Sequence, residues 1–153
     1  MNIVPGQYDS KKLRYGRLAI CTDADSDGYH IGLLIMAALS YLAPDFIKEG
    51  RLCWLRAPLY IVENGKTESY YFTDEEFDAV RASIRGAVKR CKGLGTMEPE
   101  QARRSMFTPE HQRLEVMEYS DEAMTLLYDL MGEDVEPRKA FIMNHVDFSK
   151  ITE

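Results

Sequence analysis

Residues 18–28 read Leu-Ala-Ile-Cys-Thr-Asp-Ala-Asp-Ser-Asp-Gly, an apolar run followed by three alternating carboxylates and a glycine. An apolar run of this length that ends in a polar turn is typical of a buried β-strand. Its C-terminal end is the edge at which open α/β sheets place their ligands. Like charges about 4 Å apart repel by roughly 4 kcal/mol at an effective dielectric of ~20, so the three acids must protonate, separate or hold a cation. Because oxygen ligands on a tight loop favour Mg²⁺, the stretch predicts an α/β fold with a magnesium site at Asp23, Asp25 and Asp27.

Three other interpretations of the acidic stretch compete with a magnesium site. An EF-hand also begins Asp-x-Asp-x-Asp-Gly, but its twelfth position must be Glu and is Leu34 here. A haloacid-dehalogenase-type phosphatase also opens with Asp-x-Asp after a strand, but a hydroxyl residue is expected where this chain has Asp27. An ordinary solvated acidic turn is the third, and three acids plus a glycine behind a buried strand make it less favoured.

Length and composition indicate one globular domain. The 153 residues are 45% hydrophobic, enough to bury a single core. Residues 1–12 are polar and contain Pro and Gly, so we expect a mobile leader there and the domain itself over 13–153. No apolar signal core follows Met1, and the longest apolar run, 31–42, is too short to span a bilayer. We therefore expect a cytoplasmic protein without a membrane partner.

Charge is distributed unevenly along the chain. The net charge of −6 argues against a stand-alone nucleic-acid-binding domain, which is usually strongly basic. Residues 81–104 nevertheless hold seven Lys or Arg against two Asp or Glu, whereas 110–136 hold nine acids against one Arg. This pattern predicts a basic face toward phosphate on a chain whose other surface is acidic. An ordinary charged helix surface is the alternative for Arg81, Arg85, Arg103 and Arg104.

Hydrophobic periodicity and turn signals divide the chain into short strands and helices. Residues 29–42 predict a helix that is apolar nearly all round, so we expect both of its faces to be covered. Asn64-Gly65 can supply the positive φ angles of a type I′ turn, which predicts a β-hairpin over 59–72. Further strands are expected at 52–55 and 87–91.

Capping residues and prolines mark the other helices. Thr73 and Glu76 fit a capping box, which predicts a helix that runs to about Arg85. Pro99 and Pro109 each occupy the position of a first helical residue before a helix-forming stretch. Three more helices are expected after Pro44, over 121–131 between Ser120 and Gly132, and from Pro137 to about His145.

The loop Lys92-Gly93-Leu94-Gly95 follows the last predicted strand and resembles a phosphate-binding loop. It lacks the spacing of a P-loop or of a dinucleotide fingerprint. Taken alone it is therefore a weak signal.

Several motifs, taken in order, resemble the TOPRIM half of type IIA DNA topoisomerases. The first are Lys12-Leu13-Arg14-Tyr15, the acidic stretch through His30-Ile31, and Pro58-Leu59-Tyr60. The later ones are the Lys92 loop, Met97-x-Pro99-Glu100-Gln101, and the run from Leu130 to Arg138. Their order and spacing are similar to the C-terminal part of the gyrase B protein from about residue 11 onward. Gly32 and Ile61 depart from the bacterial pattern, where Arg and Lys are usual.

The resemblance implies a subunit of an ATP-dependent type II DNA topoisomerase that supplies the Mg²⁺-binding acids for double-strand cleavage and religation. ATP would be bound by a different subunit or region. The implied catalytic residues are Asp23, Asp25 and Lys92, and the implied metal ligands are Asp23, Asp25 and Asp27. Contact with the DNA backbone is implied for His30, Lys92, Arg103 and Arg104, with helix capping or packing as the alternative for His30. No tyrosine of this chain is expected to attack DNA.

The family's metal site also needs a glutamate from a Glu-Gly-x-Ser-Ala segment, which this sequence lacks. We therefore expect part of a Rossmann-like TOPRIM domain, with a β-hairpin insertion and a C-terminal helical region, completed by another chain. The expected partners are duplex DNA, a large ATPase subunit that carries the missing segment, and a tyrosine-bearing cleavage subunit.

T-even-type bacteriophages split this domain in a similar way. That likeness favours a small separate subunit, associated with the nucleoid of a phage-infected bacterium. A piece of a longer gyrase B-like chain is the alternative. Two other functions stay open: a non-catalytic scaffold between the ATPase and cleavage subunits, and a TOPRIM-type nuclease or primase.

Overall fold

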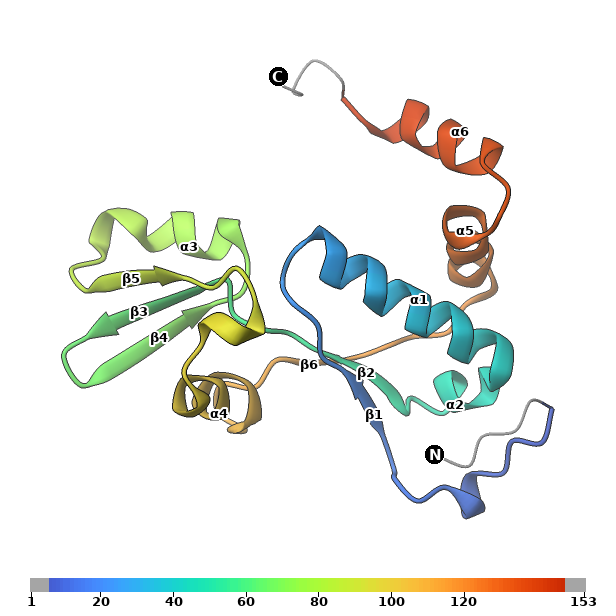
Figure 1. The fold of residues 1–153 in the computed structure, drawn as a ribbon, viewed down its shortest axis with the longest axis horizontal. Coiled ribbons are helices and arrows are strands. Elements are labelled where there is room, and N and C mark those ends of the chain that lie inside the picture. Colours follow the sequence, from blue (N-terminus) through green and yellow to red (C-terminus); the bar gives the residue numbers. More distant parts are fainter. Residues whose placement is uncertain (1–5, 148–153) are drawn as a thin grey trace. The chain divides into compact units, whose positions relative to one another are not determined.

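The computed structural model describes residues 6–147 and has two compact units, one up to Glu118 and one from Tyr119 onward (Figure 1). The first unit is a mixed α/β structure with two three-stranded sheets, and the second is a pair of helices. The predicted α/β class, the hairpin and the C-terminal helical region are confirmed at this level. None of the helices in residues 6–147 has the length and apolar character that crossing a bilayer requires.

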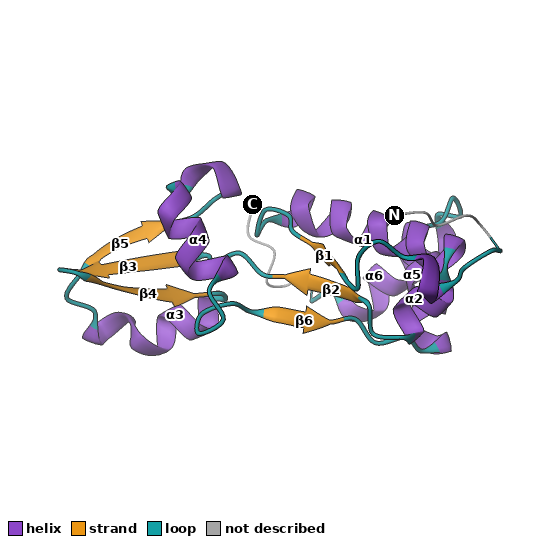
Figure 2. Ribbon diagram, turned by 90° about the horizontal axis from the view of Figure 1, so that it is seen from below, coloured by secondary structure: helices purple, strands orange, loops and turns teal. Residues whose placement is uncertain are grey.

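The first sheet has the strand order β1-β2-β6 (Figure 2). Strands β1 (Leu18–Ile20) and β2 (Leu52–Leu55) are parallel, and β6 (Leu114–Val116) runs antiparallel to β2. Parallel neighbours need a crossover, which α1 (Ser26–Leu42) and α2 (Pro44–Lys48) provide. Strand β2 is buried along its whole length, as expected for the central strand of a covered sheet.

The second sheet is antiparallel, with β3 (Tyr60–Asn64) between β4 (Thr67–Tyr71) and β5 (Ala87–Arg90). Helix α3 (Asp74–Val80) covers one face and α4 (Pro99–Phe107) covers the other (Figure 2). Alternation along β3 separates the two cores, because Tyr60 and Val62 pack on the α3 side while Ile61 packs on the α4 side. Two short 3-10 helices follow α3 and β5, η2 (Arg81–Ser83) and η3 (Leu94–Thr96).

The second unit consists of α5 (Asp121–Met131) and α6 (Glu136–His145). The Ser120 hydroxyl accepts a hydrogen bond from the Ala123 amide and caps α5, and Gly132 ends it. Both boundaries match the sequence prediction. The Arg138 guanidinium donates to the Gly132 carbonyl at 2.7 Å and fixes the turn between the helices.

Helix α1 begins three residues before the predicted start at Tyr29. Asp25 is its N-cap, and Ser26 and Asp27 form its first turn. An aspartate at the N-cap satisfies a backbone amide that has no partner inside the helix, so the acidic stretch itself starts the helix.

Only one face of α1 is covered within residues 6–118, which corrects the expectation that both faces are covered. Gly28, Gly32 and Leu39 lie on the buried face. A stripe at helical spacing is exposed: Ile31, Leu34, Ile35 and Tyr41. The prediction followed the apolar composition of the helix, but residues 6–118 place no second element over this stripe.

The hairpin turn differs from the predicted type I′ geometry. Asn64 and Thr67 are the last strand pair, so Gly65 and Lys66 are the two central residues. Gly65 has a φ of 64°, while no residue other than glycine between 6 and 147 has a positive φ. One positive φ, at a glycine in the first central position, is the pattern of a type II′ turn.

The capping residues of α3 and the bond to the Thr73 hydroxyl are as predicted, but the Glu76 carboxylate reaches back one residue further than in a capping box. The Glu76 amide donates to the Thr73 hydroxyl at 3.1 Å, while the Glu76 carboxylate accepts from the Phe72 amide at 2.7 Å. The α-helix ends at Val80 and continues only as the 3-10 helix η2, short of the predicted end at Arg85.

The helix predicted after Pro109 is wrong. Residues 109–111 form a turn, and the chain continues into β6, which pairs with β2. Leu114 packs against the core shared by Ile61 and Met106. Pairing with a buried strand and this packing outweigh the local helix signal.

Residues 1–5, the first part of the predicted leader, lie outside the described residues. Within the rest of that segment, Asp9 caps a 3-10 helix, η1 (Ser10–Lys12). The Tyr8 hydroxyl donates to the Glu49 carboxylate at 2.9 Å, so this segment contacts the end of α2.

Candidate functional site

The acidic stretch and the glycine loop, 71 residues apart in sequence, meet at the C-terminal end of β1. The Asp23 carboxylate accepts a hydrogen bond from the Leu94 amide at 2.7 Å. A Cβ on Gly93 would lie 3.0 Å from the second Asp23 oxygen, so a side chain there would crowd the carboxylate. The glycine thus permits the close approach that the loop Lys92 to Gly95 needs.

Asp25 and Asp27 lie at the start of α1. One Asp25 oxygen accepts from the Gly28 amide at 2.7 Å. Gly28 is buried, and a Cβ there would lie 2.0 Å from the Asp23 carbonyl oxygen, so this turn requires glycine. Asp25 and Asp27 are both exposed, whereas Asp23 is half-buried.

The three predicted metal ligands do not form a closed cage. Among residues 6–147, no group of three or more His, Cys, Asp or Glu side chains is arranged to hold a metal ion. Asp23 and Asp25 each use one oxygen in a backbone hydrogen bond and leave the other without a partner in the described chain. Mg²⁺ usually keeps several waters and binds through one or two carboxylates. Two half-used carboxylates fit such an ion, and the rest of its shell would come from water or another chain.

The buried hydroxyl of Thr22 lies next to these acids. Its Oγ1 atom has no hydrogen-bond partner within the described residues, and an unsatisfied buried hydroxyl is unusual. Thr22 and Asp23 line a small cavity together with Arg56. Arg56 follows β2, the parallel neighbour of β1, and such residues meet at one sheet edge. That topology was the available signal for Arg56, and the sequence interpretation overlooked it.

The two other residues near this site that are predicted to contact DNA, His30 and Lys92, are exposed. His30 lies in α1 just after the acidic turn, and Lys92 immediately precedes Gly93. Neither side chain makes a hydrogen bond or an ion pair within residues 6–147, so His30 does not cap the helix. Their predicted contact with DNA stays a prediction.

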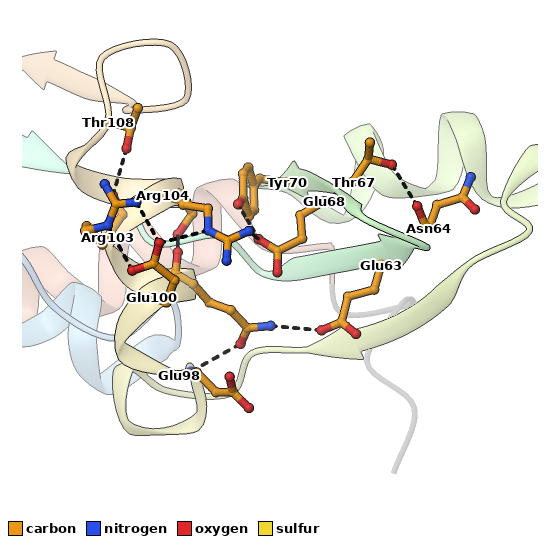
Figure 3. A network of polar contacts seen from close by, with 12 residues as sticks. Glu63, Asn64, Thr67, Glu68, Tyr70, Glu98, Glu100, Arg103, Arg104 and Thr108 are labelled. Carbon is orange, nitrogen blue, oxygen red and sulfur yellow. Dashed lines mark hydrogen bonds and ion pairs between the residues drawn. The ribbon is translucent and has the colours of Figure 1, made fainter.

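Arg103 and Arg104 lie on α4 in a network of ion pairs (Figure 3). The Arg103 guanidinium donates two hydrogen bonds, of 2.9 and 2.6 Å, to the Glu100 carboxylate. These bonds lower the pKa of Glu100 to about 2. Arg104 lies 3.3 Å from both Glu100 and Glu68. Burial, helped by the Glu68 carboxylate, raises the pKa of Tyr70 to about 12. Arg104 thus joins α4 to β4 through Glu68, whereas the Arg103 contact stays within α4. A phosphate would have to compete with Glu100 for both arginines.

Residues 85–143 match the family described as "DNA gyrase B subunit, carboxyl terminus". This chain is similar to part of gyrase B. The match includes the Lys92 loop and α4, and the acidic stretch lies before it.

Known gyrase B proteins align with nearly the whole chain. Identity is 39% over 141 residues with gyrase B of Archaeoglobus fulgidus and 36% over 143 residues with that of Thermotoga maritima, each covering 90% of this chain and 22% of the relative. With gyrase B of Spiroplasma citri it is 34% over 154 residues, covering 96% of this chain and 24% of the relative. The chain therefore spans about a quarter of the length of the curated gyrase B relatives it matches.

A solved structure shares the fold. It is the crystal structure of the Plasmodium falciparum topoisomerase II DNA-binding, cleavage and re-ligation domain, with a TM-score of 0.79 and 26% identity. The alignment covers 93% of this chain and 20% of that one. The predicted resemblance to gyrase B is confirmed, and the resemblance to a separate phage subunit stays a prediction.

Proposed function

We propose that this chain supplies the Mg²⁺-binding acids of the DNA-cleavage centre of an ATP-dependent type II topoisomerase. The observation that carries the proposal is the hydrogen bond between Asp23 and the Leu94 amide. It brings together the two segments that the sequence singled out separately, an acidic turn and a lysine on a glycine loop. Similarity to gyrase B supports the reaction class.

In the proposed reaction, a tyrosine of another subunit attacks a DNA phosphate. The residues of this chain would hold the Mg²⁺ ions and contact the DNA backbone. Asp23 and Asp25 would hold Mg²⁺, and Asp27 would hold or position a second ion. When bound, Mg²⁺ supplies Lewis-acid stabilisation of the leaving 3′ oxygen and of the charged phosphate. Lys92 and His30 would contact the neighbouring backbone, which positions the scissile phosphate over the acids.

We further propose that the chain is part of a TOPRIM domain that another chain completes. Strand β1 pairs only with β2, so its other edge is open in the described chain. Helix α1 exposes Ile31 and Leu34 by 51% and 46%. The open edge of β1 and the apolar stripe of α1, which follows β1 directly, can be covered by a strand from another chain and by the segment that flanks it. The occupant we propose is the Glu-Gly-x-Ser-Ala segment of a large ATPase subunit, whose glutamate would join Asp23 at the metal.

The version of this proposal that we favour is the phage-type arrangement, with a tyrosine-bearing cleavage subunit as the third component, because T-even-type bacteriophages split this domain in a similar way. Affinity purification of the tagged chain from its native cell, followed by mass spectrometry, tests it. Recovery of separate ATPase and cleavage chains is expected. Recovery of one longer polypeptide that contains this sequence would contradict the split arrangement.

The test of the catalytic role is Asp25→Asn in the assembled complex, assayed by Mg²⁺-dependent linearisation of supercoiled plasmid trapped with detergent. Asparagine is as good an N-cap as aspartate, so α1 stays intact while the charge is lost. We expect cleavage to be abolished. Asp9→Asn, at the N-cap of η1, is the matched control and should cleave normally. Normal cleavage by Asp25→Asn would instead support the scaffold interpretation.

A further inference from the structure

A cavity of about 440 Å³ opens between the α3 side of the second sheet and η2. Its floor is built from Tyr60 and Phe77, whose rings stack at 4.0 Å with 10° between their planes. Ile84 and Val88 add aliphatic surface at the wall. Helix α4 covers the opposite face of this sheet (Figure 2). Because Tyr60 and Phe77 line the cavity, it lies on the α3 side.

Two guanidinium groups line this cavity. Arg90, on β5, lies 5.6 Å from the centroid of the Tyr60 ring, and Arg81, in η2, lies 6.0 Å from that of Phe77. Both distances are within the range of cation–π attraction, which orients each guanidinium over the aromatic floor. Arg90 makes no ion pair within residues 6–147, so its donors are available to a ligand.

The acids next to the cavity are already engaged. Asp74 accepts a 2.6 Å hydrogen bond from the Tyr60 hydroxyl. Asp78 pairs with Arg81 at 3.7 Å, but both side chains are largely exposed, at 64% and 73%. Exposed pairs of this kind contribute little stability, so a stronger anion can displace Asp78 from Arg81.

The segment 81–92 supplies most of the residues that line the cavity, and all of its charged residues are basic. Residues 81–92 contain five Lys or Arg and no Asp or Glu, in a chain whose net charge is −6. Successive side chains of β5 point to opposite faces of the sheet. Lys89 therefore donates a hydrogen bond to Gln101 on the α4 side, while Arg90 lines the cavity. The segment leads from the cavity directly to Lys92.

We propose that this cavity binds a backbone phosphate of duplex DNA through Arg81 and Arg90. The inference rests on the proposed function, since it extends the DNA surface from Lys92 along β5. Guanidinium forks match phosphate oxygens in two-point geometry, and the aliphatic wall offers a surface for deoxyribose. A continuous basic segment favours a polyanion over a single carboxylate group.

The experiment measures binding of a short fluorescein-labelled duplex to the full chain by anisotropy, over a range of salt concentrations and without Mg²⁺. Each phosphate contact contributes about 0.9 to the slope of log K against log salt. We expect Arg90→Gln to weaken binding about three- to tenfold and to lower the slope by about 1, and Arg81→Gln,Arg90→Gln to lower it by about 2. Lys66→Gln, in the exposed hairpin turn, makes the same charge change outside the cavity and is the matched control.

A second measurement locates the contact. The methyl NMR signals of Ile84 and Val88 should shift when the duplex is added to the wild-type chain, and not when it is added to the double variant. Equal salt slopes for the double variant and Lys66→Gln, or unchanged methyl signals, would overturn the proposal. The catalytic role has its own readout: normal cleavage by Asp25→Asn would remove that role and leave these binding results as they are.

Discussion

Asp25 is the N-cap of α1 as well as a proposed metal ligand, and the cap uses only one of its two oxygens. One accepts from the Gly28 amide, and the other has no partner in the described chain. The charge and the hydrogen bond can therefore be removed separately. Asparagine removes only the charge, whereas alanine removes both.

Asp25→Ala should lower the free energy of unfolding by about 1 kcal/mol, because the first turn of α1 loses its cap. Asp25→Asn should unfold at nearly the wild-type denaturant concentration. Urea denaturation followed by circular dichroism checks both variants. Equal stability of the alanine and asparagine variants would show that the cap contributes nothing.

Glu100 should titrate far below other glutamates. The two-bond contact with Arg103 is the main cause of its pKa of about 2. A carboxylate with a depressed folded pKa stabilises the protein at neutral pH and loses that contribution as the pH falls toward the folded pKa. Carbon-detected NMR of the Glu100 carboxyl should give a midpoint near 2 that moves back toward the ordinary range in Arg103→Gln. A midpoint that Arg103→Gln leaves unchanged would rule out this ion pair as the cause.

Among the elements, α1 packs closely on β2 because Gly32, which has no side chain, lies against Trp54. A Cβ on Gly32 would lie 2.2 Å from Cη2 of Trp54, and the Tyr29 ring lies 5.7 Å from the Trp54 ring. Gly32, one of the departures from the bacterial pattern, is thus required by the tryptophan beneath it.

Gly32→Ala should destabilise the protein, although alanine is the better helix former. Overpacking costs about 1–3 kcal/mol, while replacing a helical glycine gains roughly 0.5–1 kcal/mol, so the clash wins. Gly16→Ala, with no atom near the added Cβ, is the control and should be neutral. Urea denaturation measures both, and a Gly32→Ala variant as stable as wild type would mean that Trp54 moves aside freely.

At the scale of the whole chain, the exposed stripe of α1 and the open edge of β1 should drive self-association in the absence of a partner. Sedimentation velocity of the isolated chain should show weight-average mass rising with concentration. Ile31→Gln,Leu34→Gln should shift the chain toward monomer. Phe107→Gln, which removes another exposed apolar side chain at 61% exposure, should not. A wild-type chain that stays monomeric at all concentrations would contradict this expectation.

Elements with local signals could be predicted from the sequence alone. Strand β2, helix α5 with both of its ends, and the hairpin all follow from periodicity, capping residues and turn residues. These signals act within a few residues, so they can be read without knowing the rest of the fold. The family resemblance was readable for the same reason, because its motifs are short and ordered.

Contacts between distant segments depended on the tertiary fold. It turned the stretch after Pro109 into β6, joined Arg104 to Glu68, and left one face of α1 open within residues 6–118. It also brought the Asp23 carboxylate to the Leu94 amide. Each outcome depends on which surfaces remain to be paired once the sheets form, and no window of a few residues contains that information.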